Sequence, residues 1–315
     1  MPSGIVLKST GKFYQVLLES GQSTTALIRG KIRLLADKST NPIAVGDKVE
    51  LEKIKDDADV MSIISVLPRQ NYLVRKSTNL SKKKQILAAN IDRIYLVLTI
   101  KNPVTQQGFI DRFLVSAESF RIPVTILFNK LDLLDKKEIE KQIELSEIYS
   151  KIGYACHFIS CFSQQSINFL KKEVNEKQVL FSGNSGVGKS TLINALDSTL
   201  NLKTNEISKS HLQGKHTTTF AEMHQIKSGG FLIDSPGIKA FGLAELKKEF
   251  ISHYFPEMRN LLNSCQFNNC LHLKEPNCAI KKAVDTKEIA LLRYNSYQQM
   301  MLEDEDEVHR KNDFS

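Results

Sequence analysis

The sequence predicts an α/β domain built on a parallel sheet, with a small β-barrel before it and a helical, metal-binding region after it. Short strand patterns broken by turn residues fill the first part of the chain. Apolar runs typical of buried strands then alternate with helical patterns, which indicates a parallel sheet with helices on both faces. Three cysteines and a histidine gather near the end. We therefore divide the chain into a barrel at 1–70, a basic linker at 71–90, the α/β domain at 91–242 and a metal-binding region at 243–315.

The composition is that of an ordinary globular protein. With 315 residues, of which 41% are hydrophobic and 25% charged, the chain has the length of about two or three domains. No apolar run approaches the length that spans a bilayer, and the chain starts without a basic-then-apolar leader. We therefore expect a cytoplasmic protein without membrane contact. The net charge of +8 favours a polyanionic partner.

The first seventy residues predict a closed barrel of the OB-fold kind, because short strand patterns follow one another between turn residues. The predicted strands are 4–8, 12–18, 24–29, 48–53 and 61–67. Barrels of this kind bind nucleic acid with basic loops and a strand face. Arg29, Lys31 and Arg33 can contact phosphates, although each alone is better interpreted as a solvated edge charge. Together they favour contact with nucleic acid, and we expect an RNA-binding barrel.

The linker at 71–90 is basic throughout. It contains five basic residues and no acidic one: Arg75, Lys76, Lys82, Lys83 and Lys84. Such a run is either a solvated linker or an electrostatic arm for phosphates. Because it joins the barrel to the next domain, we expect both roles.

A glycine-rich segment in the α/β domain predicts a phosphate-binding loop. It follows the apolar run 179–181 and precedes a helical pattern at 191–196, which is the context that such a loop requires. Glycines let successive backbone N–H groups and the helix N-terminus face phosphate oxygens. Lys189 can reach the β- and γ-phosphates, and a glycine-rich turn without chemistry is the weaker alternative. The expected nucleotide contacts are Gly183, Asn184, Ser185, Gly186, Val187, Gly188, Lys189, Ser190 and Thr191.

The tetrapeptide after the buried run 123–128 identifies the base. The Asp132 carboxylate can accept hydrogen bonds from both the ring N–H and the exocyclic amino group of guanine, which adenine cannot reproduce. Asn129 can bond the base edge and join neighbouring loops, while the stem of Lys130 can cover the ring face. The next predicted strand end can offer a backbone N–H to the guanine carbonyl. The predicted base contacts are Asn129, Lys130, Leu131, Asp132, Ser160 and Cys161, which favours GTP over ATP.

Two further segments suit Mg²⁺ bound with the triphosphate. Asp234 follows the apolar run 231–233, and Gly237 can approach the γ-phosphate. A polar stretch before them contains Thr217 and Thr218, one of which supplies a second hydroxyl ligand; the sequence leaves both open. A mobile surface loop is the alternative interpretation of these threonines. The predicted Mg²⁺ ligands are Ser190, Asp234 and Thr217 or Thr218.

The end of the chain contains a potential tetrahedral metal site. Cys265, Cys270, His272 and Cys278 offer three thiolates and one imidazole, a set suited to one structural Zn²⁺. Four protein ligands leave no open coordination position, so catalysis by this metal is not expected. Free buried cysteines are the alternative. The side chains of Cys156 and Cys161 are interpreted as ordinary small residues. Only the backbone of Cys161 has a predicted role.

The order of the motifs is unusual. In Ras-like GTPases the base-reading tetrapeptide comes after the phosphate loop, whereas here 129–132 precedes 183–191. A circular permutation relocates the termini without changing which strands are neighbours, so the sheet can be the same. With its barrel and cysteine-rich tail, the chain resembles the circularly permuted GTPases of the ribosome small-subunit-dependent GTPase A (RsgA) family. The resemblance covers almost the whole chain and implies that the tail helps to contact ribosomal RNA.

The residues around the triphosphate predict slow unaided hydrolysis. Ras-like enzymes place a water-orienting glutamine after the Asp-x-x-Gly turn, but this chain has Ile238, which cannot orient water. His216 is a candidate replacement by position and chemistry, and the resemblance implies the same role for it. A histidine that holds the loop or touches RNA is the alternative. The predicted catalytic residues are His216, Lys189 and Thr218.

These interpretations predict a GTP hydrolase that converts GTP and water to GDP and phosphate. The resemblance implies that it binds the small ribosomal subunit and its rRNA, assists late maturation, and leaves after subunit-stimulated hydrolysis. We expect a monomer, in which the turn at Asp234 feeds into the zinc region and couples nucleotide state to RNA affinity. Two alternatives remain: an RNA-binding assembly scaffold in which GTP is structural, and a signalling or RNA-modifying GTPase.

Overall fold

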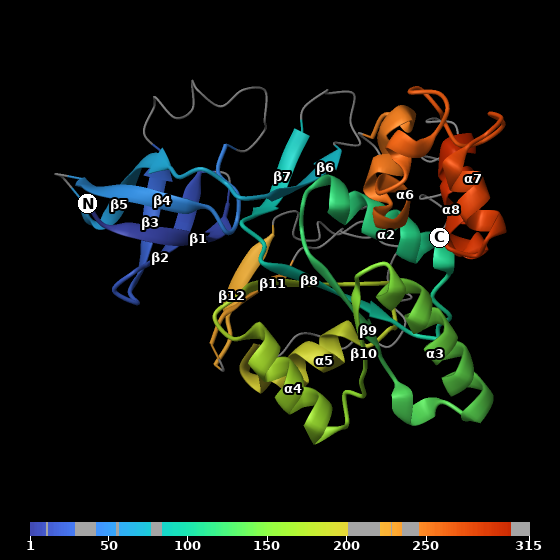
Figure 1. Ribbon diagram of the computed structural model, residues 1–315. Helices are drawn as coiled ribbons and strands as arrows, with labels where there is room; N and C mark the ends of the chain where they lie inside the picture. Colours follow the sequence, from blue (N-terminus) through green and yellow to red (C-terminus); the bar gives the residue numbers. More distant parts are fainter. Residues whose placement is uncertain are drawn as a thin grey trace, which may run out of the picture.

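The computed structural model describes residues 1–10, 12–28, 42–54, 57–76, 84–200, 221–227, 229–234 and 246–303. Figure 1 shows the N-terminal barrel at one end, the α/β sheet with its helices in the centre, and the last helices beside α2. Arg29, Lys31 and Arg33, on which the RNA contact of the barrel was predicted, lie outside the described residues.

The N-terminal strands form the predicted closed barrel. They pair in the order β1-β2-β3-β5-β4, and β4 returns to β1, which leaves no open edge between these two strands. In β2, Phe13 and Gln15 are exposed whereas Tyr14 and Val16 are buried, the alternation expected of a strand with one face on a core. The strands are β1 (Ser3–Ser9), β2 (Phe13–Leu18), β3 (Ser23–Ile28), β4 (Lys48–Ile54) and β5 (Asp57–Val66).

A hairpin occupies part of the stretch 71–90, for which the sequence predicts a linker. Strands β6 (Tyr72–Lys76) and β7 (Lys84–Ala89) pair antiparallel in a sheet of their own. Leu73, Leu87 and Ala88 are buried in the main hydrophobic core beside the central sheet. The sequence does not predict this hairpin, because the basic residues interrupt the apolar alternation of its strands.

The central sheet has the order β10-β9-β8-β11-β13-β12, in which all neighbours are parallel except β13 and β12. Helices α2 and α3 contribute to the core on one face, and α4 and α5 contribute to the core on the other. The strands are β8 (Arg93–Leu98), β9 (Val124–Phe128), β10 (Ala155–Phe158), β11 (Gln178–Ser182), β12 (Glu222–Gln225) and β13 (Phe231–Asp234). The helices are α2 (Gln107–Ser119), α3 (Lys136–Lys151), α4 (Gln164–Val174) and α5 (Lys189–Leu196).

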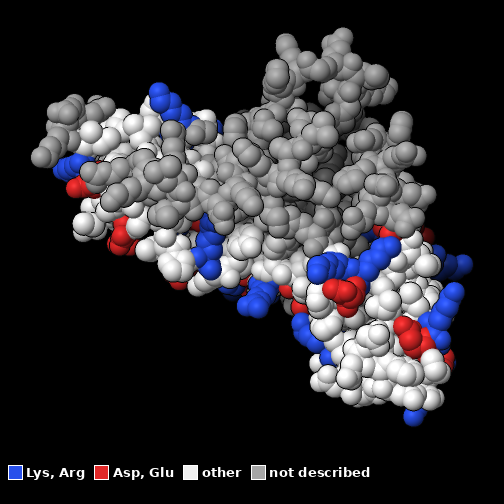
Figure 2. Space-filling view, turned by 90° about the horizontal axis from the view of Figure 1, so that it is seen from above, with Lys and Arg blue, Asp and Glu red and all other residues white. Residues whose placement is uncertain are grey.

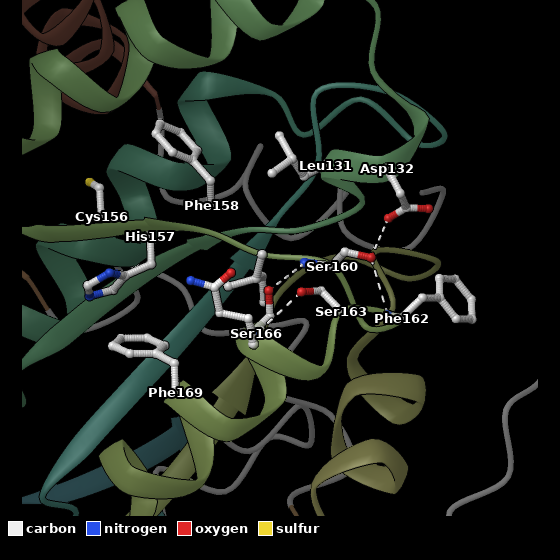
Figure 3. Close-up of a pocket in the computed structure, with 12 residues that line it drawn as sticks. Leu131, Asp132, Cys156, His157, Phe158, Ser160, Phe162, Ser163, Ser166 and Phe169 are labelled. Carbon is white, nitrogen blue, oxygen red and sulfur yellow. Dashed lines mark hydrogen bonds between the residues drawn. The ribbon is translucent and has the colours of Figure 1, made fainter.

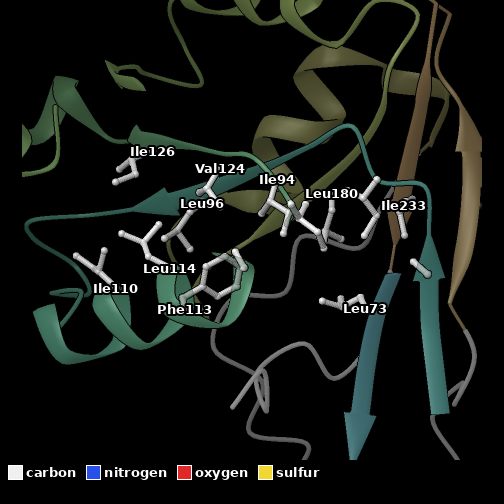
Figure 4. Packing of buried hydrophobic residues seen from close by; sticks show 14 of the residues in the cluster. Leu73, Ile94, Leu96, Ile110, Phe113, Leu114, Val124, Ile126, Leu180 and Ile233 are labelled. Atoms are coloured by element: carbon white, nitrogen blue, oxygen red, sulfur yellow. The ribbon is translucent and has the colours of Figure 1, made fainter. Parts of the chain in front are cut away.

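Strand β8 shows why the sheet is covered on both faces. Ile94 and Leu96 belong to the core under α2, whereas Tyr95 and Val97 belong to the core under α4 and α5. In Figure 4, Phe113 and Leu114 of α2 point toward the side chains of this strand and of β9. Each such buried apolar side chain contributes about 1.5–3 kcal/mol, so the continuous apolar runs of the sequence are explained by two-sided burial.

The barrel and the central sheet are joined edge to edge. Strand β1 pairs antiparallel with β12 at Lys8 and Glu222, which makes one continuous sheet of 11 strands. The Lys8 Nζ lies 3.1 Å from the Glu222 carboxylate at the same position. A backbone pairing and an ion pair therefore link the two parts.

The C-terminal helices pack against α2. A 3-10 helix (Lys248–Tyr254), α6 (Pro256–Arg259), α7 (Ala279–Asp285) and α8 (Leu291–Leu302) surround a core of their own, to which Val115 of α2 also contributes. Among the described helices, none is both long and apolar enough to span a membrane. On the face shown in Figure 2, the described Lys and Arg side chains are scattered, with acidic side chains among them.

Candidate functional site

The glycine-rich segment forms a tight turn between β11 and α5, as its pattern predicts. Gly183, Gly186 and Gly188 all have positive φ angles, of 144°, 81° and 97°. A Cβ atom at Gly183 would collide with the carbonyl oxygen of Val97, and one at Gly188 would lie 2.5 Å from the Asn129 amide nitrogen. Only glycine fits at these two positions, because both the backbone angle and the close neighbour exclude a side chain.

The other residues of the loop are arranged around the start of α5. Val187 is buried in the core under α4 and α5, which anchors the loop, while Ser185 and Gly186 are exposed. The Lys189 Nζ donates hydrogen bonds to the carbonyl oxygens of Gly183 at 2.7 Å and Asn184 at 2.6 Å. Ser190 and Thr191 follow in the first turn of the helix, where backbone N–H groups have no intrahelical partner. This arrangement can bind an anion.

The predicted base-reading residues lie directly against this loop. The side-chain amide of Asn129 donates to the carbonyl oxygen of Val187 at 2.8 Å, and the backbone N–H of Asn129 donates to the carbonyl oxygen of Leu98 at 2.8 Å. Lys130 adopts a left-handed conformation, and its Nζ donates to the carbonyl oxygen of Gly186 at 2.7 Å and to that of Asn102. Segments more than fifty residues apart in the sequence therefore form one site.

Asp132 and Ser160 meet at the ends of neighbouring segments. The Ser160 hydroxyl donates to one oxygen of the exposed Asp132 carboxylate at 2.5 Å, as Figure 3 shows. Leu131, between the two base-reading side chains, donates its backbone N–H to the Ile159 carbonyl at 3.2 Å. The Asp132 carboxylate is thus oriented by a hydroxyl and remains open to solvent. A group that accepts hydrogen bonds from a ligand must be open in this way.

Cys161 packs at the centre of the site. Its sulfur lies 3.3 Å from the Asn129 amide nitrogen, and a Cβ at Gly188 would come within 3.7 Å of it. Burial raises the pKa of the Cys161 thiol, so the side chain stays neutral near pH 7. It acts as a small spacer between the base-reading segment and the phosphate loop.

The predicted Mg²⁺ and catalytic residues are described only in part. Asp234 is the last residue of β13, which pairs in parallel with the strand that ends at the phosphate loop. Its backbone therefore leaves the sheet at the same edge as the loop. His216, Thr217, Thr218 and Gly237, together with Ile238, lie outside the described residues.

The C-terminal region brings its four predicted ligands together. The ligand atoms of Cys265, Cys270, His272 and Cys278 all lie within 4.8 Å of one another. The Nδ1 atom of His272 is 3.6 Å from the Cys265 sulfur and 3.4 Å from the Cys278 sulfur. Four donors at this spacing, three of them soft sulfurs, can hold a metal ion.

Two tyrosines of helix α8 donate hydrogen bonds to the backbone of this cluster. The Tyr294 hydroxyl donates to the carbonyl oxygen of His272 at 2.7 Å, and the Tyr297 hydroxyl donates to that of Leu271 at 2.7 Å. His272 itself has a positive φ of 57°, which turns the chain so that its ring faces the cysteines. The ligand loop is therefore held in shape by α8 and by the Glu275 carboxylate, which accepts from backbone N–H groups within the loop.

Comparisons with known proteins cover nearly the entire chain. The family profile of the RsgA GTPase matches residues 66–244, and that of the RsgA N-terminal domain matches residues 3–61. The chain belongs to the RsgA GTPase family. It is 47% identical over 312 residues to the small ribosomal subunit biogenesis GTPase RsgA of Flavobacterium johnsoniae, covering 99% of this chain and 95% of the relative. The corresponding protein of Bacteroides fragilis is 47% identical over 304 residues, with 96% and 97% covered.

Two solved structures have the same fold. YjeQ from Thermotoga maritima matches with a TM-score of 0.78 and 33% identity over 95% of this chain and 97% of that one. YloQ, described as a circularly permuted GTPase, matches with a TM-score of 0.75 and 30% identity over 99% and 96%. The fold is therefore a circularly permuted GTPase domain with an N-terminal β-barrel and a C-terminal Cys₃His region, as predicted.

One segment of the site was missed in the sequence. The turn after β8 supplies the Asn102 carbonyl that accepts from Lys130, and Pro103 lies 3.4 Å from where a Cβ of Gly186 would be. Its position at the carboxyl end of a central parallel strand was the available signal, because ligands of such sheets bind there. In this member of the RsgA family, the turn bridges the base-reading segment and the phosphate loop.

Proposed function

We propose that this protein hydrolyses GTP to GDP and phosphate and assists late maturation of the small ribosomal subunit. The observation that carries the proposal is the direct contact between the base-reading segment and the phosphate loop, through Asn129 to Val187 and Lys130 to Gly186. The relatives from Flavobacterium johnsoniae and Bacteroides fragilis are named small ribosomal subunit biogenesis GTPases. We propose the division at 1–70, 71–90, 91–242 and 243–315 as the domains that carry this function.

The described residues would bind GTP with separate groups for each part of the nucleotide. Asp132 would accept from the guanine edge, and the Ser160–Cys161 segment would offer a backbone N–H to the guanine carbonyl. The Ser160 N–H donates to the Ser166 hydroxyl at 3.3 Å, so we assign this contact to the N–H of Cys161. The loop 183–188 and the start of α5 surround the phosphates with N–H donors, because glycine lets the backbone approach closely. Lys189, which already donates to two carbonyls inside the loop, lies where a β- or γ-phosphate oxygen would replace them.

Ser190, Asp234 and Thr217 or Thr218 would hold Mg²⁺, which supplies positive charge to the phosphates. Ser190 lies in the first turn of α5 and Asp234 ends the adjacent parallel strand, so the chain positions of these two fit. We further propose His216 as the group that orients water, with Lys189 and Thr218 as the other catalytic residues. Because Ile238 cannot orient water, the subunit is expected to complete the site.

For the C-terminal cluster we propose one structural Zn²⁺. Three thiolates and an imidazole close a tetrahedral shell, so this ion would shape the region without taking part in hydrolysis. We propose that the barrel and this region contact rRNA, and that the protein is a cytoplasmic monomer that makes no membrane contact. Ordering of the turn at Asp234 would couple nucleotide state to RNA affinity.

GTP turnover measured with and without purified small subunits tests the proposal. We expect slow turnover alone, strong stimulation by the subunits, and loss of that stimulation in His216→Ala with nearly unchanged GTP affinity. His224→Ala, which changes a half-buried histidine in β12, is the matched control and should keep stimulation. Binding of subunits without any stimulated turnover would contradict hydrolysis as the function and favour a scaffold in which GTP is structural.

A further inference from the structure

Phe162 is an exposed aromatic side chain beside the base-reading carboxylate. It lies in the loop between β10 and α4, and 84% of it is exposed. Burying a phenylalanine contributes about 1.5–3 kcal/mol, so exposure forgoes a substantial gain in stability. Nearby, Phe158 packs on Phe128 and Phe169 packs on His157, but no ring contact of Phe162 is found among the described residues. Its ring is therefore open to a ligand.

The backbone of Phe162 is held at a fixed distance from Asp132. Its N–H donates to the Ser160 hydroxyl at 3.2 Å, and the same hydroxyl donates to the Asp132 carboxylate at 2.5 Å. On the other side, Ser163 begins α4 and its side chain accepts from the backbone N–H of Ser166 at 3.4 Å. In Figure 3 the Asp132 carboxylate and the Phe162 ring extend to the same side of Ser160.

A cavity of about 670 Å³ lies next to this position. It runs along β10 and the start of α4, and Asp132, Ser160 and Phe162 are among the residues that line it. None of the phosphate-loop residues 183–191 lines it, so the cavity is distinct from the phosphate loop. Phe162 stands at the rim that the cavity shares with the base-reading carboxylate.

We propose that Phe162 stacks on the guanine ring of the bound nucleotide, an inference that rests on the proposed GTP site. A guanine base has a polar edge, which Asp132 accepts from, and two apolar faces. The Lys130 stem is drawn across the site by the hydrogen bonds of its Nζ to Gly186 and Asn102, where it can cover one face. An aromatic ring anchored next to Asp132 suits the second face, since base–aromatic stacking is favourable and largely indifferent to base identity.

This role makes a distinctive kinetic prediction. Stacking acts equally on the bound substrate and the transition state, so Phe162→Ala should raise KM for GTP and leave kcat at saturation unchanged. The dissociation constants for GDP, inosine diphosphate and xanthosine diphosphate should all rise about tenfold, or 1.4 kcal/mol. Phe162→Tyr should restore the affinity, which separates a ring effect from a disturbed loop. The substituted side chain is exposed, so the fold should not change.

Fluorescence tests the contact directly, because the chain contains no tryptophan. Phe162→Trp places a single indole at the site, and Phe13→Trp places one on the barrel strand β2, where the native ring is 42% exposed. Titrating the full-length protein with GDP should quench the first variant and leave the second unchanged. Binding of radiolabelled GDP is measured in parallel on both variants and on the native chain.

Three outcomes would overturn the inference. If radiolabelled GDP binds normally but the Phe162→Trp emission does not respond, stacking is refuted while the proposed GTP site stands. If Phe162→Ala keeps its GDP affinity and instead binds small subunits more weakly, the ring faces RNA or ribosomal protein. If the native chain binds no radiolabelled GDP, the proposed function fails and the stacking inference fails with it.

Discussion

At the scale of single residues, two side chains of one tetrapeptide have different tasks. The Asn129 amide is used inside the protein, where it donates to the Val187 carbonyl and joins the two nucleotide-binding segments. The exposed Asp132 carboxylate is held by Ser160 and directed outward. Substituting Asn129 would therefore disturb the phosphate loop as well as base binding, whereas substituting Asp132 would leave the contacts of the phosphate loop in place.

Asp132→Asn should change the preferred base from guanine to xanthine. The new amide keeps one acceptor for the ring N–H and presents a donor, which clashes with the amino group of guanine but suits the 2-oxo group of xanthine. Losing a charge-assisted hydrogen bond costs about 1.5–3 kcal/mol, so GDP affinity should fall by about 100-fold while xanthosine diphosphate affinity rises. Equilibrium binding of both nucleotides measures the change.

Asp135→Asn is the matched control for this exchange. Asp135 caps α3 by accepting from the Glu138 N–H at 2.9 Å, and asparagine can do the same. Its nucleotide preference should match that of the native chain. Retained preference for GDP in Asp132→Asn would show that the base is not read by this carboxylate.

At the scale of elements, the cysteine-rich loop depends on both its metal and α8. We expect one equivalent of zinc in the native protein, measured by mass spectrometry, and its loss in Cys278→Ser. Since Cys278 also precedes α7 as its cap residue, loss of the ion should expose this helix to protease at lower temperature. Cys156→Ser, which changes a half-buried thiol in β10, is the control and should retain zinc and resistance. Full zinc content in Cys278→Ser would contradict the assigned ligand set.

The elements also show what a single sequence reveals. Strands buried on both faces, such as β8 and β11, produce continuous apolar runs that a sequence reveals. Contiguous motifs such as 129–132 are also recognisable, because all their residues lie together in the sequence. The β6–β7 hairpin was missed because its lysines and short alternation resemble a linker. The link from Lys130 to Asn102 was missed for a different reason: a carbonyl acceptor 28 residues away carries no side-chain signal.

At the scale of the whole molecule, two junctions connect the proposed nucleotide site to the other parts. On one side, β12 and β13 form a hairpin that ends at Asp234, and the outer strand of this hairpin pairs with β1 of the barrel. On the other side, α2 begins a few residues after the turn that contacts Lys130, and packs on the C-terminal helices. Both sides of the proposed site are therefore connected through described backbone to a part proposed to contact rRNA.

The junction with the C-terminal helices is centred on Arg293 of α8. Its guanidinium lies 2.6 Å from the Asp111 carboxylate of α2 and 2.7 Å from that of Glu257, and the Arg293 and Asp111 side chains are buried. Burial lowers the pKa of Arg293, but these two carboxylates outweigh burial and hold the pKa above its usual value. The Tyr149 hydroxyl of α3 donates to the same Asp111 oxygen at 2.7 Å. Four elements therefore meet at one charged group.

Arg293→Met should weaken this junction strongly, because it leaves the buried Asp111 without its cation and Glu257 without a partner. Breaking a buried pair by removing one member costs about 3–5 kcal/mol, which thermal denaturation should report as a lower midpoint. Arg259→Met is the control: Arg259 pairs with Glu118 at 3.3 Å across the same junction but is exposed, so the loss should be at most about 1 kcal/mol. Adding Asp111→Asn to Arg293→Met should recover part of the stability, since it removes one stranded charge. Equal midpoints for Arg293→Met and Arg259→Met would show that the junction is held by apolar packing rather than by this ion pair.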